Sequence, residues 1–322
     1  MLWLPIDRPR PARCRIGTRP QTRALLAFFL LTSGSESLRA QTIDDGVMMP
    51  RKSLCTGFLY AHDSWDQYWE GTLKRANGNI GTITTQSVTW MGNYGVTDRL
   101  NVIAMVPYVW TNASQGVLHG MNGLQDLTVA AKYNVLETAF TGHGFLRTIL
   151  VASAGAPITD YTPDFLPLSI GSASRRFSGR AALNFQAKAG WFVNASAAYT
   201  WRDKVTLDRP SYFTDGRLHL SDEVAMPDVF DYTISAGYRK QGLHIPFSFT
   251  QQSTLGGGDV RRQDMPFVSN RMNFSKVDAL VMYFLPKTKN LAVRVAAAYT
   301  VSGRNVGQAS TVTAGLLYTL HF

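Results

Sequence analysis

Apolar and polar residues alternate in strand-length stretches along most of this chain, from about residue 54 to its end. The stretch 193–202 shows the pattern clearly, because its odd-numbered residues are all apolar or aromatic and most of its even-numbered residues are polar. Residues 243–250 and 291–300 repeat it. Successive side chains of a β-strand point to opposite faces, so each stretch predicts a strand with one apolar and one polar face.

About twelve such strands are predicted, and no change in composition divides them into two domains. An even number of antiparallel strands is typical of bacterial outer-membrane barrels. The predicted strands cover approximately residues 54–69, 80–94, 99–112, 124–135, 144–157, 179–190, 191–203, 226–240, 242–252, 270–285, 288–300 and 306–322.

The connections between these strands alternate in length. Those after the second, sixth, eighth and tenth strands are short, as in "GVTD" at residues 95–98, and the one after the fourth is moderate. Those after the first, third, fifth, seventh and ninth strands are longer. A soluble sandwich also shows period two, but it needs a second sheet over each apolar face. Short periplasmic turns and longer extracellular loops are typical of outer-membrane barrels. We therefore expect an all-β, closed antiparallel transmembrane barrel, with "GVTD" periplasmic and residues 159–178 extracellular.

The N-terminal residues are typical of a secretory signal peptide. Six arginines between residues 8 and 23 precede the apolar run "ALLAFFLLT" at 24–32, and small and polar residues then lead to "LRAQT". This layout predicts cleavage after Ala40, leaving residues 41–322 as one barrel domain. No segment reaches the roughly 20 apolar residues of a membrane-spanning helix. These features predict the outer membrane of a Gram-negative bacterium, with its lipid as the surrounding partner.

The C-terminal strand carries a second targeting pattern. It ends in an aromatic residue that is preceded by apolar residues at every second position. This pattern resembles the strand read by the barrel assembly machinery, which we therefore expect as a partner. The residues assigned to this signal are Leu316, Tyr318, Leu320 and Phe322.

The positive charge of the chain does not indicate a nucleic-acid partner. The formal net charge is +10, of which residues 1–40 contribute +5 through seven arginines and two acids. Removing them leaves 25 basic and 20 acidic residues, with no basic run interleaved with aromatic residues. Cys55 is then the single cysteine, so no disulfide forms within the mature chain, and we interpret this thiol as structural.

Three segments resemble a known family, the outer-membrane proteins named for the MetA pathway of phenol degradation. They are "NYGVTDRLNVIAMVPYV" at 93–109, "GLQDLTVAAKYNV" at 123–135 and "ASAGAPITD" at 152–160. They are similar to the family's turn-strand-proline segment, its Gly-x-x-Asp-Leu strand and its proline-containing strand end. The resemblance implies a channel for small, often aromatic, compounds and supplies no catalytic residues.

Candidate chemical motifs are few. Outer-membrane phospholipases use serine activated by histidine, but none of the six histidines here has a serine neighbour in a recognisable nucleophile motif. The cluster "HDSWDQYWE" at 62–70 could hold a cation or a sugar, although an interfacial aromatic belt explains it better. "GGGD" at 256–259 is interpreted as a flexible loop tip. No metal-ligand spacing occurs, so no metal, cofactor or enzymatic activity is predicted.

The loop "YTPDFLPLSI" at 161–170 is unusually apolar for an exposed loop. It packs into the barrel mouth or forms a lip for the substrate, or else it simply packs against neighbouring loops.

Strand parity assigns a set of charged side chains to the lumen. Bases outnumber acids in this set, which predicts a preference for small anions. We expect a passive channel for small solutes, including aromatic or hydrophobic ones; the alternatives are a phospholipase-like barrel hydrolase and a non-conducting structural or adhesive barrel. The lumen candidates are Lys132, Lys188, Arg202, Asp231, Arg239, His244, Lys276, Asp278 and Arg294.

Overall fold

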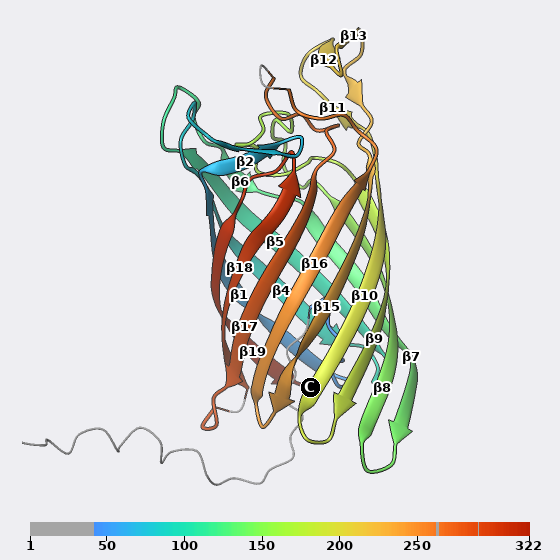
Figure 1. Cartoon of the computed structure of the whole chain (residues 1–322). Helices are drawn as coiled ribbons and strands as arrows, with labels where there is room; N and C mark the ends of the chain where they lie inside the picture. The colour runs from blue at the N-terminus through green and yellow to red at the C-terminus, as the bar shows by residue number, and fades with distance from the viewer. Residues whose placement is uncertain (1–41, 262–263, 289) are drawn as a thin grey trace, which may run out of the picture. The chain divides into compact units, whose positions relative to one another are not determined.

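The computed structural model describes residues 42–261, 264–288 and 290–322, so the predicted signal peptide and its cleavage point lie outside the described residues. The described chain is built from strands joined by turns and loops (Figure 1). No helix in this described part is long and apolar enough to cross a membrane.

Twelve long strands form the wall of a barrel. Each has 12 to 14 residues, enough to cross the hydrocarbon core of a bilayer when the strand is tilted. They are β1 (Ser53–Trp65), β4 (Ile83–Gly95), β5 (Leu100–Ala113), β7 (Leu127–Phe140), β8 (Gly144–Ala156), β9 (Arg176–Ala187), β10 (Trp191–Arg202), β15 (Asp228–Lys240), β16 (Leu243–Leu255), β17 (Asn273–Phe284), β18 (Leu291–Arg304) and β19 (Ser310–His321).

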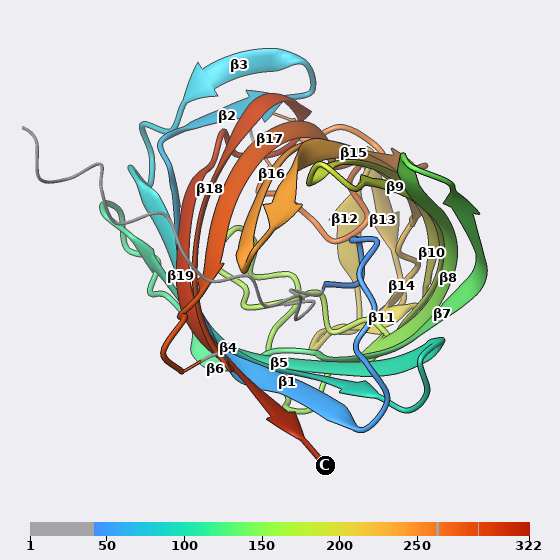
Figure 2. The same ribbon diagram turned by 90° about the horizontal axis from the view of Figure 1, so that it is seen from below.

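The wall closes on itself. Every long strand pairs antiparallel with the next long strand in the chain, and β1 pairs with β19 from Ser53↔His321 to Ser64↔Ser310. Figure 2 shows the resulting ring along its axis. A closed ring satisfies all backbone groups between strands and leaves no edge, as a bilayer requires. The predicted twelve-stranded antiparallel barrel is confirmed.

Short strands lie in the long loops at one end of the wall (Figure 1). They form two hairpins, a further two-stranded ribbon and an extension beside β5. They are β2 (Gln67–Glu70), β3 (Leu73–Ala76), β6 (Asn122–Leu124), β11 (Val205–Thr206), β12 (Tyr212–Thr214), β13 (Arg217–His219) and β14 (Glu223–Val224).

The predicted alternation of connection lengths is also confirmed. The short connections 96–99, 141–143, 188–190, 241–242 and 285–290 lie at the lower end in Figure 1, and the longer loops lie at the upper end. Most strand bounds agree with prediction to within a few residues. β9 lies about three residues earlier than predicted at both ends, because the turn to β10 begins after Ala187 rather than near Ala189.

The outer face of the wall is apolar and exposed. Along one strand after another, the outward positions carry large apolar or aromatic side chains, such as Leu183 in β9, Ile234 in β15 and Phe247 in β16. Aromatic rings also stack in pairs near the long-loop rim, as Phe177 does on Trp201 with centroids 5.8 Å apart. An exposed apolar band around a closed barrel matches the hydrocarbon region of a membrane. Four C-terminal residues share this face: Leu316, Tyr318, Leu320 and Phe322.

The inner face near the short turns carries both apolar and polar side chains. Two buried clusters include Ile103, Ile149, Met282 and Phe284, and polar residues such as Asn184 are buried there as well. Cys55 belongs to one of the two clusters, which agrees with its structural interpretation. A barrel of about eight strands is filled by its own side chains, whereas a barrel of 16 or more strands encloses a channel. A twelve-stranded barrel therefore has space in its lumen that the side chains of its wall do not fill.

We expect the two ends of the barrel to lie on opposite sides of the membrane. A cysteine replacing Val117, a highly exposed residue of the β5–β7 loop, should react with an impermeant maleimide on intact cells. A cysteine at Thr97, in the short β4–β5 turn, should react only after the outer membrane is permeabilised. Labelling of Thr97→Cys on intact cells would contradict this orientation.

Candidate functional site

Residues 42–50, here called the plug segment, lie inside the barrel near its short-turn end. Figure 2 shows this blue segment within the ring of strands. Met48 packs against Ile103 and Ile149, while Met49 packs against the cluster that holds Met282. Both methionines are almost fully buried. Burial of such side chains contributes about 1.5–3 kcal/mol each, so the segment is a packed part of the barrel.

Ion pairs hold the acidic residues of the plug segment to the wall. The Nζ of Lys132, which is fully buried, donates to Asp45 Oδ1 at 2.7 Å and to the Thr42 carbonyl at 2.8 Å. Asp44 lies with Oδ1 3.1 Å from the Nε of Arg180. The Asn194 amide donates to the Asp44 carbonyl at 3.0 Å. Because a buried charge is costly without its partner, these contacts fix the segment in one position.

Gly46 passes very close to β9. A Cβ built at this position would lie 2.0 Å from the Cγ and 2.1 Å from the Cβ of Asn184, distances that no side chain tolerates. Asn184 is itself fully buried on the inner face. Only glycine therefore allows the plug segment to lie against the wall here.

Eight of the nine predicted lumen residues lie on inward faces of strands. Arg239 shows the environment: its Nε donates to Gln186 at 2.8 Å, and its guanidinium lies over the Phe192 ring at 4.9 Å. His244 is buried, with its ring 5.2 Å from Phe192. The eight are Lys132, Arg202, Asp231, Arg239, His244, Lys276, Asp278 and Arg294.

Lys188 is the exception. Its prediction as a lumen residue is wrong, because β9 ends at Ala187 and places Lys188 in the short turn to β10 with its side chain exposed. The error follows from the shift in the bounds of β9, since parity arguments apply only within a strand.

Sequence reasoning missed inward charges of both signs, the bases Arg176 and Arg180 and the acids Asp44, Asp45 and Asp126. Arg180 donates from Nη2 to Asp231 at 2.7 Å, and Arg176 donates from Nη1 to Asp126 at 2.9 Å. With Asp44 and Asp45 of the plug segment, these acids reduce the basic excess to a small one. Parity could have assigned Arg180 to the lumen, but Arg176 lies before the predicted strand 179–190, and nothing in the sequence placed residues 44 and 45 there.

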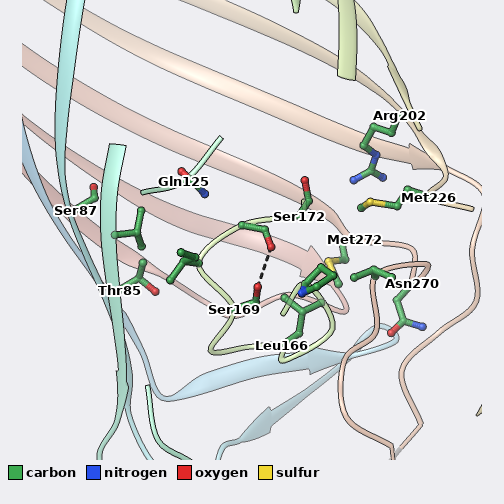
Figure 3. A pocket seen from close by; sticks show the side chains of 15 residues that line it. Thr85, Ser87, Gln125, Leu166, Ser169, Ser172, Arg202, Met226, Asn270 and Met272 are labelled. Carbon is green, nitrogen blue, oxygen red and sulfur yellow. Dashed lines mark hydrogen bonds between the residues drawn. The ribbon is translucent and has the colours of Figure 1, made fainter. Parts of the chain in front are cut away.

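A cavity of about 360 Å³ lies at the other end of the lumen, beneath the long loops (Figure 3). Its wall comes from the inward faces of β4, β5 and β10 and from the loops β8–β9, β10–β15 and β16–β17. Several of these loops meet in a buried cluster that includes Leu207, Met226 and Phe267. Packed loops therefore form part of the cavity wall.

The apolar loop 161–170 enters the barrel mouth and lines this cavity, as one of its two interpretations predicted. Thr111 Oγ1 donates to the Leu168 carbonyl at 2.6 Å, and this hydrogen bond anchors the end of the loop. The Tyr161 hydroxyl donates to Asp126 and accepts from the Ala173 N–H at 2.7 Å. Burial, together with the hydrogen bond to Asp126, raises the pKa of Tyr161, so the hydroxyl stays protonated and remains a donor.

The two remaining motifs are structural. In the 62–70 cluster, Asp63 points inward and accepts from Thr311 Oγ1 at 2.6 Å, whereas His62 is exposed, so they share no site.

Asp259, at the end of the "GGGD" motif, pairs with Nε and Nη2 of Arg304 at 2.7 and 2.6 Å. The Arg304 guanidinium holds the pKa of Asp259 at about 2. This ion pair holds the loop to β18, whereas the sequence predicted a flexible loop tip.

One serine–histidine contact exists at the short-turn rim. Ser53 Oγ lies 2.9 Å from His321 Nδ1, across the β1–β19 pair. The serine is buried, and no carboxylate among the described residues contacts the ring of His321. A nucleophile needs access to substrate and an oriented base, so this pair does not form a hydrolase site. The described residues also contain no cluster of three or more potential metal ligands.

Comparison with solved structures places the fold among outer-membrane barrels. The COG4313 outer membrane channel from Pseudomonas putida F1 superimposes with a TM-score of 0.67 and 14% identity, over 84% of this chain and 97% of that one. At a TM-score of 0.44 and 10% identity, the TodX deltaS2S3 mutant monoaromatic hydrocarbon channel aligns over 85% of this chain and 91% of that one. The NanC porin aligns with a TM-score of 0.42 and 9% identity, over 81% of this chain and 100% of that one.

A search of curated protein sequences found no match. The sequence model of one family matches residues 76–315, which is most of the barrel from the β1–β4 loop into β19. The match includes all three segments that carried the resemblance in the sequence. The chain belongs to the family described as "Putative MetA-pathway of phenol degradation".

Proposed function

We propose that this protein is a passive channel for small solutes, including aromatic and hydrophobic ones, in the outer membrane of a Gram-negative bacterium. The observation that carries the proposal is the closed barrel with an apolar outer band, a charged inner face and a cavity under its loops. The similar barrel from Pseudomonas putida F1 is described as an outer membrane channel, and the family's description links it to phenol degradation. We assign the protein no catalytic role.

The experiment that tests this function is the conductance of the refolded, full-length mature protein in a planar bilayer. Discrete current steps that phenol or benzoate reduces would support passage of small aromatic solutes. A barrel that spans the bilayer, releases no entrapped small solutes from vesicles and gives no current steps would exclude the channel and favour a structural or adhesive barrel. Release of fatty acid from phospholipid vesicles would instead support a hydrolase.

The pore should show a modest preference for anions at low salt. Arg202, Lys276 and Arg294 face inward and form no ion pair among the described residues, so the lumen keeps a small positive excess. A low-dielectric wall focuses this field, and the preference should vanish as the Debye length falls to about 3 Å at 1 M salt. Reversal potentials in a salt gradient measure it.

A matched pair of variants separates this effect from a general change in the pore. Arg202→Gln should reduce the anion preference, whereas Arg217→Gln, in the exposed β12–β13 hairpin, should leave it unchanged. Cation selectivity of the unaltered pore, or equal effects of the two substitutions, would contradict the assignment of Arg202 to the conducting lumen.

A further inference from the structure

The cavity under the long loops has the size of a small-molecule site. Its volume is about 360 Å³. Ligand sites in proteins begin at about 300 Å³, and an apolar cavity of about 150 Å³ is large enough for benzene. The space therefore admits a single aromatic ring with a substituent.

Part of the cavity lining is apolar. Val109 on β5, Leu166 and Ile170 on the β8–β9 loop, and Met226 and Met272 on the two later loops line it (Figure 3). Ile170 and Val109 are almost fully buried, so their positions are fixed by packing. Methionine side chains adapt to the shape of a ligand and contact aromatic rings favourably. These apolar side chains suit the ring of an aromatic molecule.

The cavity lining also carries a cation with unused hydrogen-bonding capacity, which Figure 3 shows beside Met226. Arg202, at the end of β10, donates from Nε to the Pro227 carbonyl at 2.7 Å and also from Nη2. Its Nη1 has no partner among the described residues, and the guanidinium forms no ion pair there. The neighbouring carboxylate of Asp228 accepts instead from the backbone N–H of Arg202 at 3.1 Å and from the Tyr199 hydroxyl.

Two further polar side chains in the cavity are available for a ligand. Gln125 and Ser172 line it, and neither makes a side-chain hydrogen bond within the described part of the chain. Ser172 and Arg202 thus line the same cavity. An arginine with a free N–H and a nearby hydroxyl suits a carboxylate, because charge-assisted hydrogen bonds are stronger than neutral ones.

We propose that this cavity is a binding site for small aromatic carboxylates, with the carboxylate at Arg202 and the ring between Ile170, Met226 and Met272. The inference names a solute class for the proposed channel and so rests on that function. A neutral hydrocarbon would contact the apolar part of the lining but leave the guanidinium without a partner. The preference for an aromatic carboxylate over a neutral hydrocarbon therefore depends on Arg202.

Equilibrium dialysis of radiolabelled benzoate against the refolded, detergent-solubilised full-length barrel tests the proposal. Benzoate should bind at one site, and benzyl alcohol, its neutral analogue of similar shape, should compete at least tenfold more weakly. Arg202→Gln should weaken benzoate binding by roughly tenfold or more, as expected for loss of a charged hydrogen bond, while leaving the affinity for benzyl alcohol unchanged. Arg217→Gln, outside the cavity, is the matched control.

A second variant keeps the test independent of any folding defect at Arg202. Ser172→Trp should fill the cavity and abolish binding of both compounds while Arg202 is retained. Equal affinity for benzoate and benzyl alcohol, or benzoate binding that survives Arg202→Gln in a folded barrel, would overturn the inference. A barrel that conducts but binds no benzoate would overturn it while leaving the channel function intact. A barrel that binds benzoate but conducts nothing would support the binding site and exclude the channel function.

Discussion

Replacing Gly46 by leucine should raise the single-channel conductance of the refolded barrel by roughly twofold or more, because the segment that occupies the lumen near the short turns can no longer lie there. The new side chain would collide with Asn184 at the base of its side chain, which cannot rotate away. Displacing the segment also removes Met48 and Met49 from the apolar clusters of the inner wall. Current steps in planar bilayers measure the change.

The same substitution should change selectivity. When the plug segment leaves, Asp44 and Asp45 leave with it, and Lys132 and Arg180 lose these partners. Arg180 keeps its second partner, Asp231, so the main new charge is that of Lys132. The anion preference at low salt should therefore rise together with the conductance.

Two comparisons make this prediction specific. Gly78→Leu, in the β1–β4 loop, has nothing within 4 Å of the added Cβ and should leave conductance unchanged. Deletion of residues 42–49 should reproduce the larger conductance of Gly46→Leu without adding a side chain. If the deletion variant folds and conducts like the unaltered protein, the plug segment does not obstruct the permeation path.

The wall of the barrel could be predicted from the sequence because strand periodicity depends on neighbouring residues alone. The alternation in 193–202 reflects a strand whose odd-numbered residues face outward, and the structure places Val193, Tyr199 and Trp201 there. The alternating connection lengths then indicated an outer-membrane barrel, because its short turns lie at one rim and its long loops at the other. These local rules gave the number of strands and eight of the nine inward positions.

The two candidate sites could not be predicted in the same way, because they depend on contacts between distant parts of the chain. Asp45 lies 87 residues from Lys132, and only the closed ring brings them to 2.7 Å. The residues around Arg202 come likewise from three loops whose paths follow from packing around Leu207 and Phe267. Neither the plug segment nor the cavity has a periodic pattern, so the sequence indicated only an apolar loop near the mouth.

Ile234→Arg should destabilise the barrel by about 2–4 kcal/mol when the free energy of unfolding is measured in phospholipid vesicles, because it places a charge at the lipid-facing middle of a strand. Ile234 is the seventh of the 13 residues of β15, and 51% of its side chain is exposed on the outer surface. It pairs with Phe249 and Ala195, so no acidic side chain lies directly beside it to compensate for the charge.

Leu220→Arg is the matched control, because Leu220 is even more exposed, at 84%, but lies in the long β10–β15 loop. In water an exposed substitution of this kind usually changes stability by less than about 0.5 kcal/mol. A soluble barrel would tolerate both arginines equally, since both positions are exposed. A large cost at Ile234 with none at Leu220 therefore locates the hydrocarbon core of the membrane at the middle of β15, and equal small costs would place the outer face of the wall in water.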